Sequence, residues 1–247
     1  MTAQLYLQKV CKRYGETTVL DRITTTFREG RITALIGPSG CGKSTLLILC
    51  NGLLRPDSGV VHVLGNPIDY QQLPQLRRRL GYAVQGTGLF PHLTAIDNIT
   101  LMARLANWEA ARIQERLQEL VALNQLDEAL LPRYPHELSG GQQQRVGLCR
   151  AMMLSPDIML LDEPFAAIDP ITRREIQEQF VVAHQAEPVT VLLVTHDIRE
   201  ALFLSDHIVI MRAGRISHTL DKQQLYVGGD DMAEEKLQQL IAGGSAS

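Results

Sequence analysis

The feature that most constrains the fold of this chain is a glycine-rich octapeptide at residues 37–44, which fits the phosphate-binding pattern G-x-x-x-x-G-K-[ST]. It follows a wholly apolar segment, residues 32–36, and runs into a helix-forming segment, residues 43–53. Glycine lets backbone N–H groups converge on phosphate oxygens, and a helix N-terminus adds partial positive charge. A strand, a glycine loop and a helix in this order therefore predict a site for a nucleoside triphosphate, with a chance glycine-rich turn as the alternative.

The remaining pattern predicts an α/β fold. Short β-rich segments at residues 5–10, 17–20 and 23–27 alternate with turns at Tyr14-Gly15 and Glu29-Gly30, which indicates a small antiparallel sheet at the N-terminus. Further apolar segments alternate with helical ones, as in a mostly parallel buried sheet. These segments are residues 158–161, 189–194 and 208–211. Gly214 is expected to turn a final hairpin between residues 208–211 and 215–218.

Residues 87–155 carry a helical pattern between these two groups of strands. Apolar side chains at helical spacing lie on one face of the segment, with charged side chains largely on the other. The apolar set is Ile113, Leu117, Leu120 and Val121. We therefore expect a P-loop NTPase core with a mostly parallel sheet, an N-terminal antiparallel β subdomain and an inserted α-helical subdomain.

These patterns also predict the domain limits. We expect residues 1–240 to form a single domain, with a core at residues 1–86 and 156–240 and a helical lobe at residues 87–155. Residues 241–247, rich in glycine, serine and alanine, are expected to be a flexible tail.

Composition excludes several classes of protein. The 247 residues carry a formal charge of −3 with both signs mixed, so no basic block indicates a nucleic-acid partner. The first ten residues lack the pattern of a signal peptide, and the apolar runs are far shorter than the ~20 residues of a membrane helix. The four cysteines and seven histidines show no metal-ligand spacing, and we expect reduced thiols in a cytosolic compartment.

An acidic pair ends the apolar segment at residues 158–161. Asp162 and Glu163 would be costly to bury there unless a metal ion or hydrogen bonds met them. Asp162 suits a Mg²⁺ ligand, together with the Ser44 hydroxyl, while Lys43 would reach the β- and γ-phosphates. A solvated strand end before Pro164 is the alternative.

The second glycine motif reads Leu-Ser-Gly-Gly-Gln at residues 138–142. Ser139 and Gln142 have the spacing of a capping box ahead of a helix. A simple cap does not need the paired glycines Gly140 and Gly141, which permit close approach of the backbone. We expect both interpretations to hold, with Ser139 capping a helix whose N-terminus faces a phosphate.

Taken in order, these motifs resemble the ATPase subunit of ATP-binding-cassette (ABC) transporters, and the resemblance covers nearly the whole chain. It implies that Glu163 is the general base and that His196 contacts the γ-phosphate. Gln85 resembles the family's glutamine loop, which contacts Mg²⁺ or the attacking water. Taken singly, Gln85 reads as a surface glutamine and His196 as a histidine at a strand end.

The resemblance also implies a set of nucleotide contacts. Tyr14 matches the aromatic residue that stacks on adenine, and Asp169 matches a loop that communicates across a dimer. Ala166 stands where the common pattern of that loop has serine, so a hydrogen bond assigned to the serine is in question. The expected nucleotide-binding residues are Tyr14, Gly37, Pro38, Ser39, Gly40, Cys41, Gly42, Lys43, Ser44, Thr45, Ser139, Gly140, Gly141, Gln142 and Asp169. We also expect a reactive Cys41 thiol, because it precedes a helix N-terminus, with an inert thiol that faces the core as the alternative.

In this family two subunits close head to tail around two Mg·ATP. The resemblance therefore implies a homodimer, with ATP and Mg²⁺ bound between one subunit's phosphate loop and the other's Ser139 motif. It further implies membrane permease subunits docked near Gln85 and the helical lobe, an associated substrate-binding protein, and a peripheral position at the cytoplasmic face of the bacterial inner membrane.

The strings at residues 76–82, 85–94 and 133–139 are similar to those of bacterial importers, above all importers of glycine betaine, choline and related osmoprotectants. A polar amino-acid importer is the nearby alternative. A soluble ABC ATPase of DNA repair or translation is a third, although the chain shows no extended heptads and a single cassette. A nucleotide-binding scaffold without hydrolysis is disfavoured by Glu163 and His196.

Overall fold

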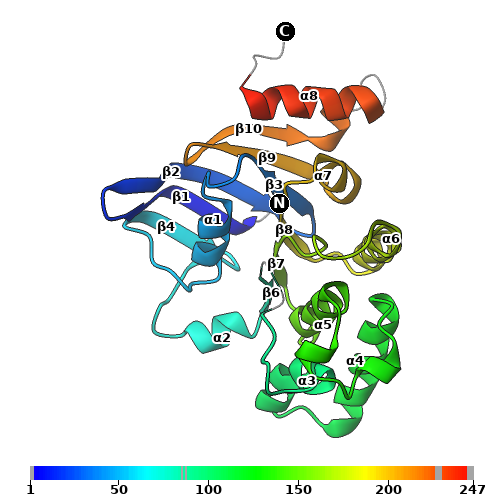
Figure 1. The fold of residues 1–247 in the computed structure, drawn as a ribbon. Coiled ribbons are helices and arrows are strands. Elements are labelled where there is room, and N and C mark those ends of the chain that lie inside the picture. Colours follow the sequence, from blue (N-terminus) through cyan, green and yellow to red (C-terminus); the bar gives the residue numbers. More distant parts are fainter. Residues whose placement is uncertain (1–2, 85, 87, 226–229, 244–247) are drawn as a thin grey trace. The chain divides into compact units, whose positions relative to one another are not determined.

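The computed structural model describes residues 3–84, 86, 88–225 and 230–243 (Figure 1). Its contacts divide the chain into two compact units. The first unit comprises Met1–Leu73 and Val189–Ser247, and the second comprises Pro74–Pro188. The boundaries of these two units differ from the limits predicted for the core and the helical lobe. The predicted limits stay a prediction.

The first unit contains the antiparallel sheet expected at the N-terminus. Its strands are β1 (Ala3–Tyr14), β2 (Thr17–Arg28), β4 (Ser58–Val63) and β5 (Asn66–Pro67), in the order β2-β1-β4-β5. The two β-rich segments at residues 17–20 and 23–27 lie in one continuous strand, β2. Its pairing with β1 shifts register between Val10↔Ile23 and Lys12↔Leu20, and Arg22 has a φ of 50° at this irregularity. A bulge of this kind carries one strand through a local kink.

The first unit also contains parallel strands. The wholly buried strand β3 (Ile32–Ile36) pairs in parallel with β8 (Thr190–Val194) and β9 (His207–Arg212). Strand β10 (Arg215–Asp221) returns antiparallel to β9 around Gly214, which confirms the predicted hairpin. Because β3 and β8 are parallel, their carboxyl ends meet at one edge, and Thr195 N–H donates to the Leu35 carbonyl across 3.3 Å.

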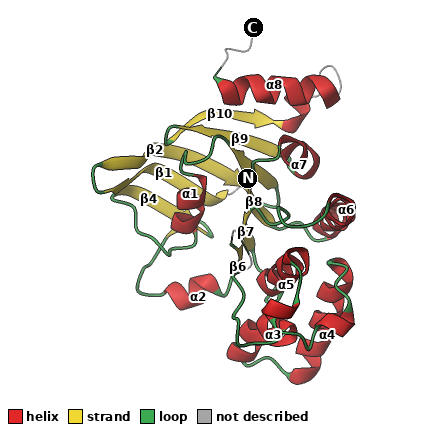
Figure 2. Cartoon of the chain, in the orientation of Figure 1, coloured by secondary structure: helices red, strands yellow, loops and turns green. Residues whose placement is uncertain are grey.

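The helices of the first unit lie around these strands (Figure 2). Helix α1 (Lys43–Cys50) follows the glycine loop, and α7 (Ile198–Leu204) follows β8. Helix α8 (Asp230–Ala242) was not predicted. Its side chains Ala233, Leu237 and Leu240 are buried in a cluster with Ile208 and Ile210 of β9. A short 3₁₀ turn, η3 (Lys222–Gln224), comes between β10 and α8.

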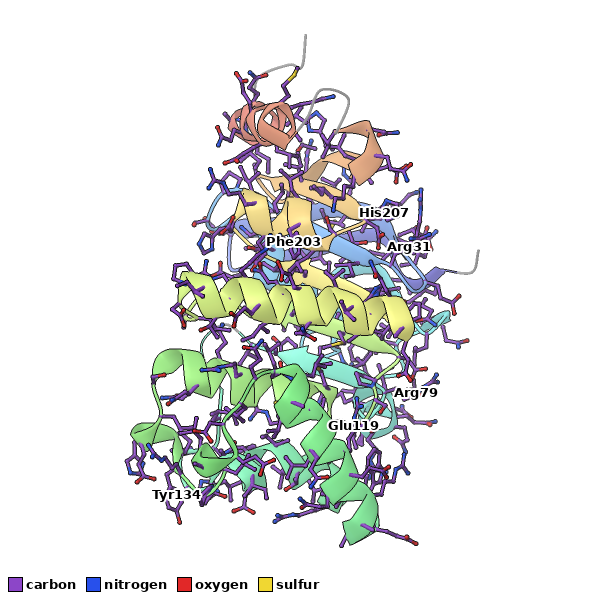
Figure 3. All side chains as sticks on the ribbon, turned by 90° about the vertical axis from the view of Figure 1, so that its right-hand side faces the viewer. Arg31, Arg79, Glu119, Tyr134, Phe203 and His207 are labelled. Carbon is purple, nitrogen blue, oxygen red and sulfur yellow. The ribbon has the colours of Figure 1, made fainter. Side chains whose placement is uncertain are left out.

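The second unit contains two parallel strands, β6 (Leu80–Ala83) and β7 (Ile158–Asp162), after the short helix α2 (Leu73–Arg77). At their amino ends Arg79, labelled in Figure 3, forms an ion pair with Asp157 at 2.8 Å. Its helices are α3 (Ala95–Leu105), α4 (Ala110–Leu123), α5 (Gly140–Met152) and α6 (Pro170–Ala186), with 3₁₀ turns η1 (Glu128–Leu130) and η2 (Pro135–Glu137).

Helices α3, α4 and α5 share one apolar core, as the periodicity of the sequence predicted. Leu117, Leu120 and Val121 of α4 are buried, and they cluster with Ile99 of α3 and Val146 of α5. In the part of the chain that the structure describes, no helix is long and apolar enough to span a membrane.

Candidate nucleotide-binding and hydrolysis site

The phosphate loop follows β3, and one side of the loop, its inner side, packs closely against strands β2 and β9. A Cβ atom on Gly37 would overlap the Met211 carbonyl oxygen of β9. At Gly42 (φ 105°) a Cβ would lie 2.8 Å from the Val19 carbonyl oxygen of β2. Gly40, with a φ of 76°, would meet nothing within 4 Å, so that side of the loop is open. Only glycine fits the inner positions, and the backbone is left free to face a ligand.

Lys43 is held inside this loop. Its side chain is 8% exposed, and its Nζ donates to the carbonyl oxygens of Gly37 (2.7 Å) and Pro38 (3.0 Å). Ser44 and Thr45 follow in the first turn of α1 and are half-buried. The loop therefore carries a buried positive charge and a hydroxyl at the start of a helix, which is the donor set that phosphate and its metal ion need.

Cys41 does not fit the expectation of a reactive thiol. It is 6% exposed, and its Sγ lies 3.9 Å from Lys43 Nζ. Reactivity of a thiol requires access as well as charge, so the burial of Cys41 argues against this prediction. Pro38, Ser39 and Gly40 are the exposed members of the loop.

His196 lies at the same edge of the parallel strands as the phosphate loop. It follows β8, and Thr195 before it bonds to Leu35 at the end of β3. His196 is exposed, and Asp197 after it caps α7 by accepting from the N–H groups of Arg199 and Glu200. Tyr14 ends β1, is 52% exposed, and has Lys12 Nζ 5.9 Å from its ring centre.

In the second unit the acidic pair lies at the end of β7, as predicted. Asp162 is 5% exposed and Glu163 is half-buried. Burial, and next the negative charge of Asp162, raise the pKa of Tyr82 on the neighbouring strand β6. Glu163 has a φ of 50°, in the left-handed region that residues other than glycine rarely adopt.

The Ser139 motif forms the capping box that the sequence predicted. Ser139 Oγ accepts from Gln142 N–H (3.3 Å), and Gln142 Oε1 accepts from Ser139 N–H (2.8 Å). Ser139 and Gly140 are exposed at the start of α5. The close approach at Gly141 is to the chain itself, because a Cβ there would lie 3.1 Å from the Ala167 carbonyl oxygen.

Asp169 caps α6. Its carboxylate accepts from Thr172 N–H at 3.0 Å, and this backbone hydrogen bond holds the pKa of Asp169 below its usual range. Gln85 lies outside the described residues.

Gln144, which was not among the predicted site residues, links the Ser139 helix to Glu163. The side chain of Gln144 is buried and bonds to the backbones of Glu163 and Ala167. A signal was available, because residues 144, 148 and 151 recur at helical spacing on the buried face of α5.

The residue types suit ATP with Mg²⁺. The Ser44 hydroxyl and the Asp162 carboxylate are hard oxygen donors, which Mg²⁺ prefers. Among the described residues no group of three or more His, Cys, Asp or Glu side chains could hold a metal ion. Mg²⁺ is usually held by one or two side chains together with substrate phosphates, and the Ser44 hydroxyl and the Asp162 carboxylate, each taken singly, are donors of that kind.

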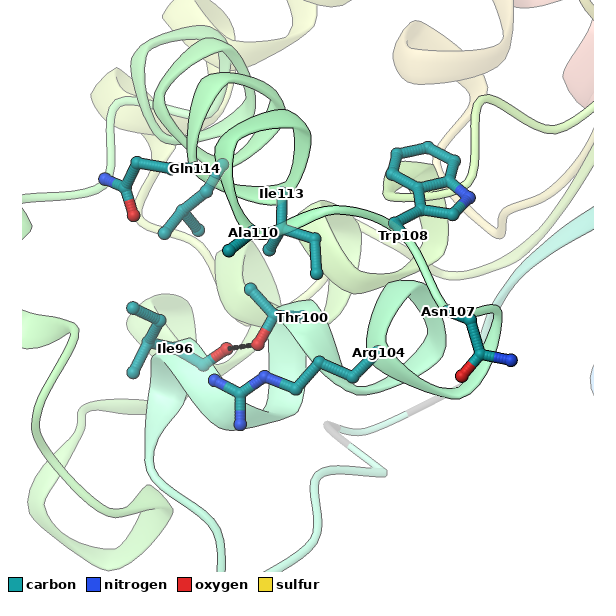
Figure 4. Close-up of a pocket in the computed structure, with 9 residues that line it drawn as sticks. Ile96, Thr100, Arg104, Asn107, Trp108, Ala110, Ile113 and Gln114 are labelled. Carbon is teal, nitrogen blue, oxygen red and sulfur yellow. Dashed lines mark hydrogen bonds between the residues drawn. The ribbon is translucent and has the colours of Figure 1, made fainter.

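A separate cavity of about 570 Å³ lies between α3 and α4 (Figure 4). Ile96, Thr100 and Arg104 line it from α3, and Ile113 lines it from α4. Trp108 lies at its rim, with the Arg112 guanidinium 3.6 Å from the ring centre. Apolar side chains and the positively charged Arg104 both line this cavity.

A glycine cradle with a buried lysine, an acidic strand end and a capped Ser-Gly-Gly helix define an ATP-binding cassette, the ATPase domain of ABC transporters. Residues 20–166 match the family described as ABC transporter. By this match and by the relatives below, the chain belongs to the ABC transporter family.

Two relatives and one solved structure show how close the similarity is. The glycine betaine uptake system ATP-binding protein YehX of Escherichia coli (strain K12) is 45% identical over 84% of this chain and 67% of its own length. The glycine betaine/carnitine/choline transport ATP-binding protein OpuCA of Bacillus subtilis (strain 168) is 44% identical over 86% of this chain and 56% of its own. The dimeric ATP-binding cassette MJ0796 bound to ADP and Pi has a TM-score of 0.82 at 30% identity, covering 88% of this chain and 98% of that one.

Proposed function

We propose that this chain is the ATP-hydrolysing subunit of a bacterial importer that takes up a small solute, a quaternary-ammonium osmoprotectant such as glycine betaine or choline. The names of YehX and OpuCA support the solute class. The chain spans 67% and 56% of the lengths of these relatives.

The roles of the site residues form part of the proposal. Lys43 binds the β- and γ-phosphates, while Ser44, Asp162 and Gln85 hold Mg²⁺. Mg²⁺, when bound, neutralises charge on the phosphate oxygens. Glu163 accepts a proton from the attacking water, and His196 orients the γ-phosphate. Tyr14 stacks on the adenine. The observation that carries this assignment is the phosphate loop, where only glycine fits against β2 and β9 and where Lys43 is buried.

The active form is proposed to be a head-to-tail homodimer that closes around two ATP. The cassette MJ0796, which has the same fold, is dimeric, and this supports the assembly. The exposed Ser139 and Gly140 would meet the partner's γ-phosphate, and Asp169 would lie at the interface. ATP touching both subunits favours the closed dimer, and hydrolysis removes that preference.

Permease subunits are proposed to dock on the second unit near Gln85 and the cavity between α3 and α4. The apolar side chains that line this cavity, together with Arg104 and Arg112, suit a short amphipathic helix with acidic side chains. The chain would then act peripherally at the cytoplasmic face of the membrane, with a substrate-binding protein as an indirect partner and no nucleic acid.

The base is tested by Glu163→Gln, which keeps the size of the side chain and removes its basicity. ATP turnover should fall by about 10²-fold or more, the scale of general-base removal, while ATP binding persists. An ATP-dependent dimer should then appear in size exclusion. Unchanged turnover would remove Glu163 from this role.

The shared site is tested by mixing Ser139→Arg and Lys43→Ala subunits. Each homodimer has a defect in both sites, whereas in the mixed dimer one site receives both defects and the other receives neither. Hydrolysis should therefore recover partly in the mixture. No recovery in verified heterodimers would contradict two independently competent sites.

The importer assignment is tested by purification from detergent-solubilised membranes. A polytopic membrane protein should co-purify with the chain, and uptake of labelled glycine betaine or choline by cells should be lost in the Glu163→Gln variant. Normal uptake of both solutes in that variant would point to another cargo.

A further inference from the structure

Gln144 ties helix α5 to the segment that carries the proposed base. Its Nε2 donates to the carbonyl oxygen of Glu163, and its Oε1 accepts from the N–H of Ala167, each across 2.7 Å. The side chain is 5% exposed. Both ends of the amide are therefore used, and the orientation of the side chain is determined.

The segment that Gln144 holds is residues 163–169, here called the acidic loop. Its first residue, Glu163, has left-handed backbone geometry with a φ of 50°. This geometry costs free energy for a residue with a Cβ and persists only where the surroundings maintain it. The carbonyl of Glu163 accepts a second hydrogen bond, from Ala166 N–H at 3.3 Å, so this one atom anchors the turn.

Other contacts fix the far end of the acidic loop. The first turn of α5 approaches it closely at Gly141, where a Cβ would lie 3.1 Å from the Ala167 carbonyl oxygen. Arg173 of α6 donates to the carbonyl oxygens of Ile168 (2.8 Å) and Ala166 (3.2 Å). Gln144 therefore makes a contact at the Glu163 end of a loop that is also held at its other end.

We propose that Gln144 is a positioning residue for ATP hydrolysis, which aims the Glu163 carboxylate by holding the backbone of Glu163 in its left-handed conformation. The inference rests on the proposed role of Glu163 as the base. A general base must lie within hydrogen-bond reach of the water it activates, and small misplacements reduce the rate strongly. Gln144 does not touch the nucleotide in this account, so ATP binding is not affected by its loss.

The first test is Gln144→Leu, which has a similar size and makes neither hydrogen bond. The kcat for ATP should fall by about 10-fold to 100-fold, with little change in KM or in ATP affinity, because only the aim of the base is lost. Gln143→Leu is the matched control, since the contacts of the described residues give the Gln143 side chain one hydrogen bond, to the Leu138 carbonyl, and none to the acidic loop.

The second test is Gln144→Glu, which distinguishes positioning from general stability. A protonated carboxyl can donate to the Glu163 carbonyl and accept from Ala167, as the amide does, whereas an ionised carboxylate cannot donate. Burial and the negative charges of Asp162 and Glu163 would raise the pKa of the new carboxyl. Arg150, which lines the same small cavity, and Arg173 would lower it.

The ratio of the Gln144→Glu rate to the wild-type rate should therefore rise as the pH is lowered from about 8 to about 6. The same ratio for Gln143→Glu should stay flat. The pH shift is made on one folded protein, so the result stands even if Gln144→Leu does not fold.

The outcomes separate this inference from the proposed function. A flat ratio for Gln144→Glu, or a kcat for folded Gln144→Leu within about twofold of wild type, overturns the role of Gln144 provided that Glu163→Gln is inactive. If Glu163→Gln keeps full turnover, the assignment of the base fails instead.

Discussion

Two helices of this chain begin at glycine-rich sequences, and they begin in different ways. Helix α1 starts after Gly42, which is left-handed and has no side chain that could accept from the first turn. Helix α5 starts after Ser139, which is extended and forms a capping box with Gln142 in both directions. The first N–H groups of α1 therefore face no side-chain competitor, whereas those of α5 are partly satisfied within the chain.

The glycines at the two helix starts also have different structural roles. Those of the phosphate loop remove Cβ atoms that would strike β2 and β9, so the loop can fold over Lys43. Gly141 removes a Cβ that would crowd Ala167, so α5 can lie against the acidic loop. The phosphate loop therefore leaves the start of α1 without a side-chain cap, while the Ser139 motif is a capped helix start that packs against its own chain.

Among the variants that test this difference, Gly42→Ala is expected to have the largest effect on ATP affinity. The new Cβ would lie 2.8 Å from a backbone carbonyl at a φ of 105°, so the loop must distort. Losing two or more hydrogen bonds to charged phosphate, each worth about 1.5–3 kcal/mol, should weaken ATP binding by about 10²-fold or more in titration calorimetry.

Gly140→Ala is the matched control at the other helix. Its Cβ would lie 3.7 Å from the Ala167 Cβ, which is ordinary contact. Folding and ATP affinity of the single subunit should stay close to wild type. Equal losses of ATP affinity in Gly42→Ala and Gly140→Ala would show that the two helix starts do not differ in their role.

A smaller effect is expected for Lys43→Ala. Lys43 is one donor within an otherwise intact cradle, so ATP affinity should fall by about 1.5–3 kcal/mol, or about 10-fold to 10²-fold. Calorimetry of the monomer measures the loss, with Lys236→Ala on the exposed face of α8 as the control for removal of a lysine. Unaltered affinity would exclude Lys43 from the phosphate site.

Ser139→Ala should act on stability rather than on the binding of ATP by one subunit. Removal of an N-cap side chain costs about 0.5–2 kcal/mol, to be read from urea denaturation. Thr94→Ala removes the N-cap of α3, where Thr94 accepts from Asp97 N–H, and should cost a similar amount. A large fall in monomer ATP affinity for Ser139→Ala alone would show that this helix start also serves its own chain's nucleotide.

The smallest effect concerns the thiol inside the phosphate loop. Cys41 is 6% exposed, whereas Cys11 is half-buried, so a maleimide should label Cys11 before Cys41. Burial raises the pKa of Cys149 to about 12 and also raises that of Cys50, so neither should react in the folded chain. Peptide mass spectrometry at successive times measures the order in which the cysteines are labelled. Labelling of Cys41 before Cys11 would support the prediction of a reactive Cys41 thiol.

The sequence by itself determined the order of strand, glycine loop and helix, the amphipathic helix α4, the final hairpin and the capping box at Ser139. Each depends on residues close together in the chain. Glycine content, apolar spacing and a Ser–Gln pair three residues apart act through local backbone geometry and hydrogen bonds, so they can be read without the fold.

Only the tertiary structure decided the rest. The continuity of β2 through Arg22 depends on its pairing with β1, and the burial of Cys41 depends on the loop that folds around it. Glu163 has a left-handed backbone conformation. Its carbonyl accepts a hydrogen bond from Gln144, which lies in another element, helix α5. Helical spacing could have indicated that Gln144 is buried, but it could not name the partners of Gln144, because such contacts form only when distant segments are packed together.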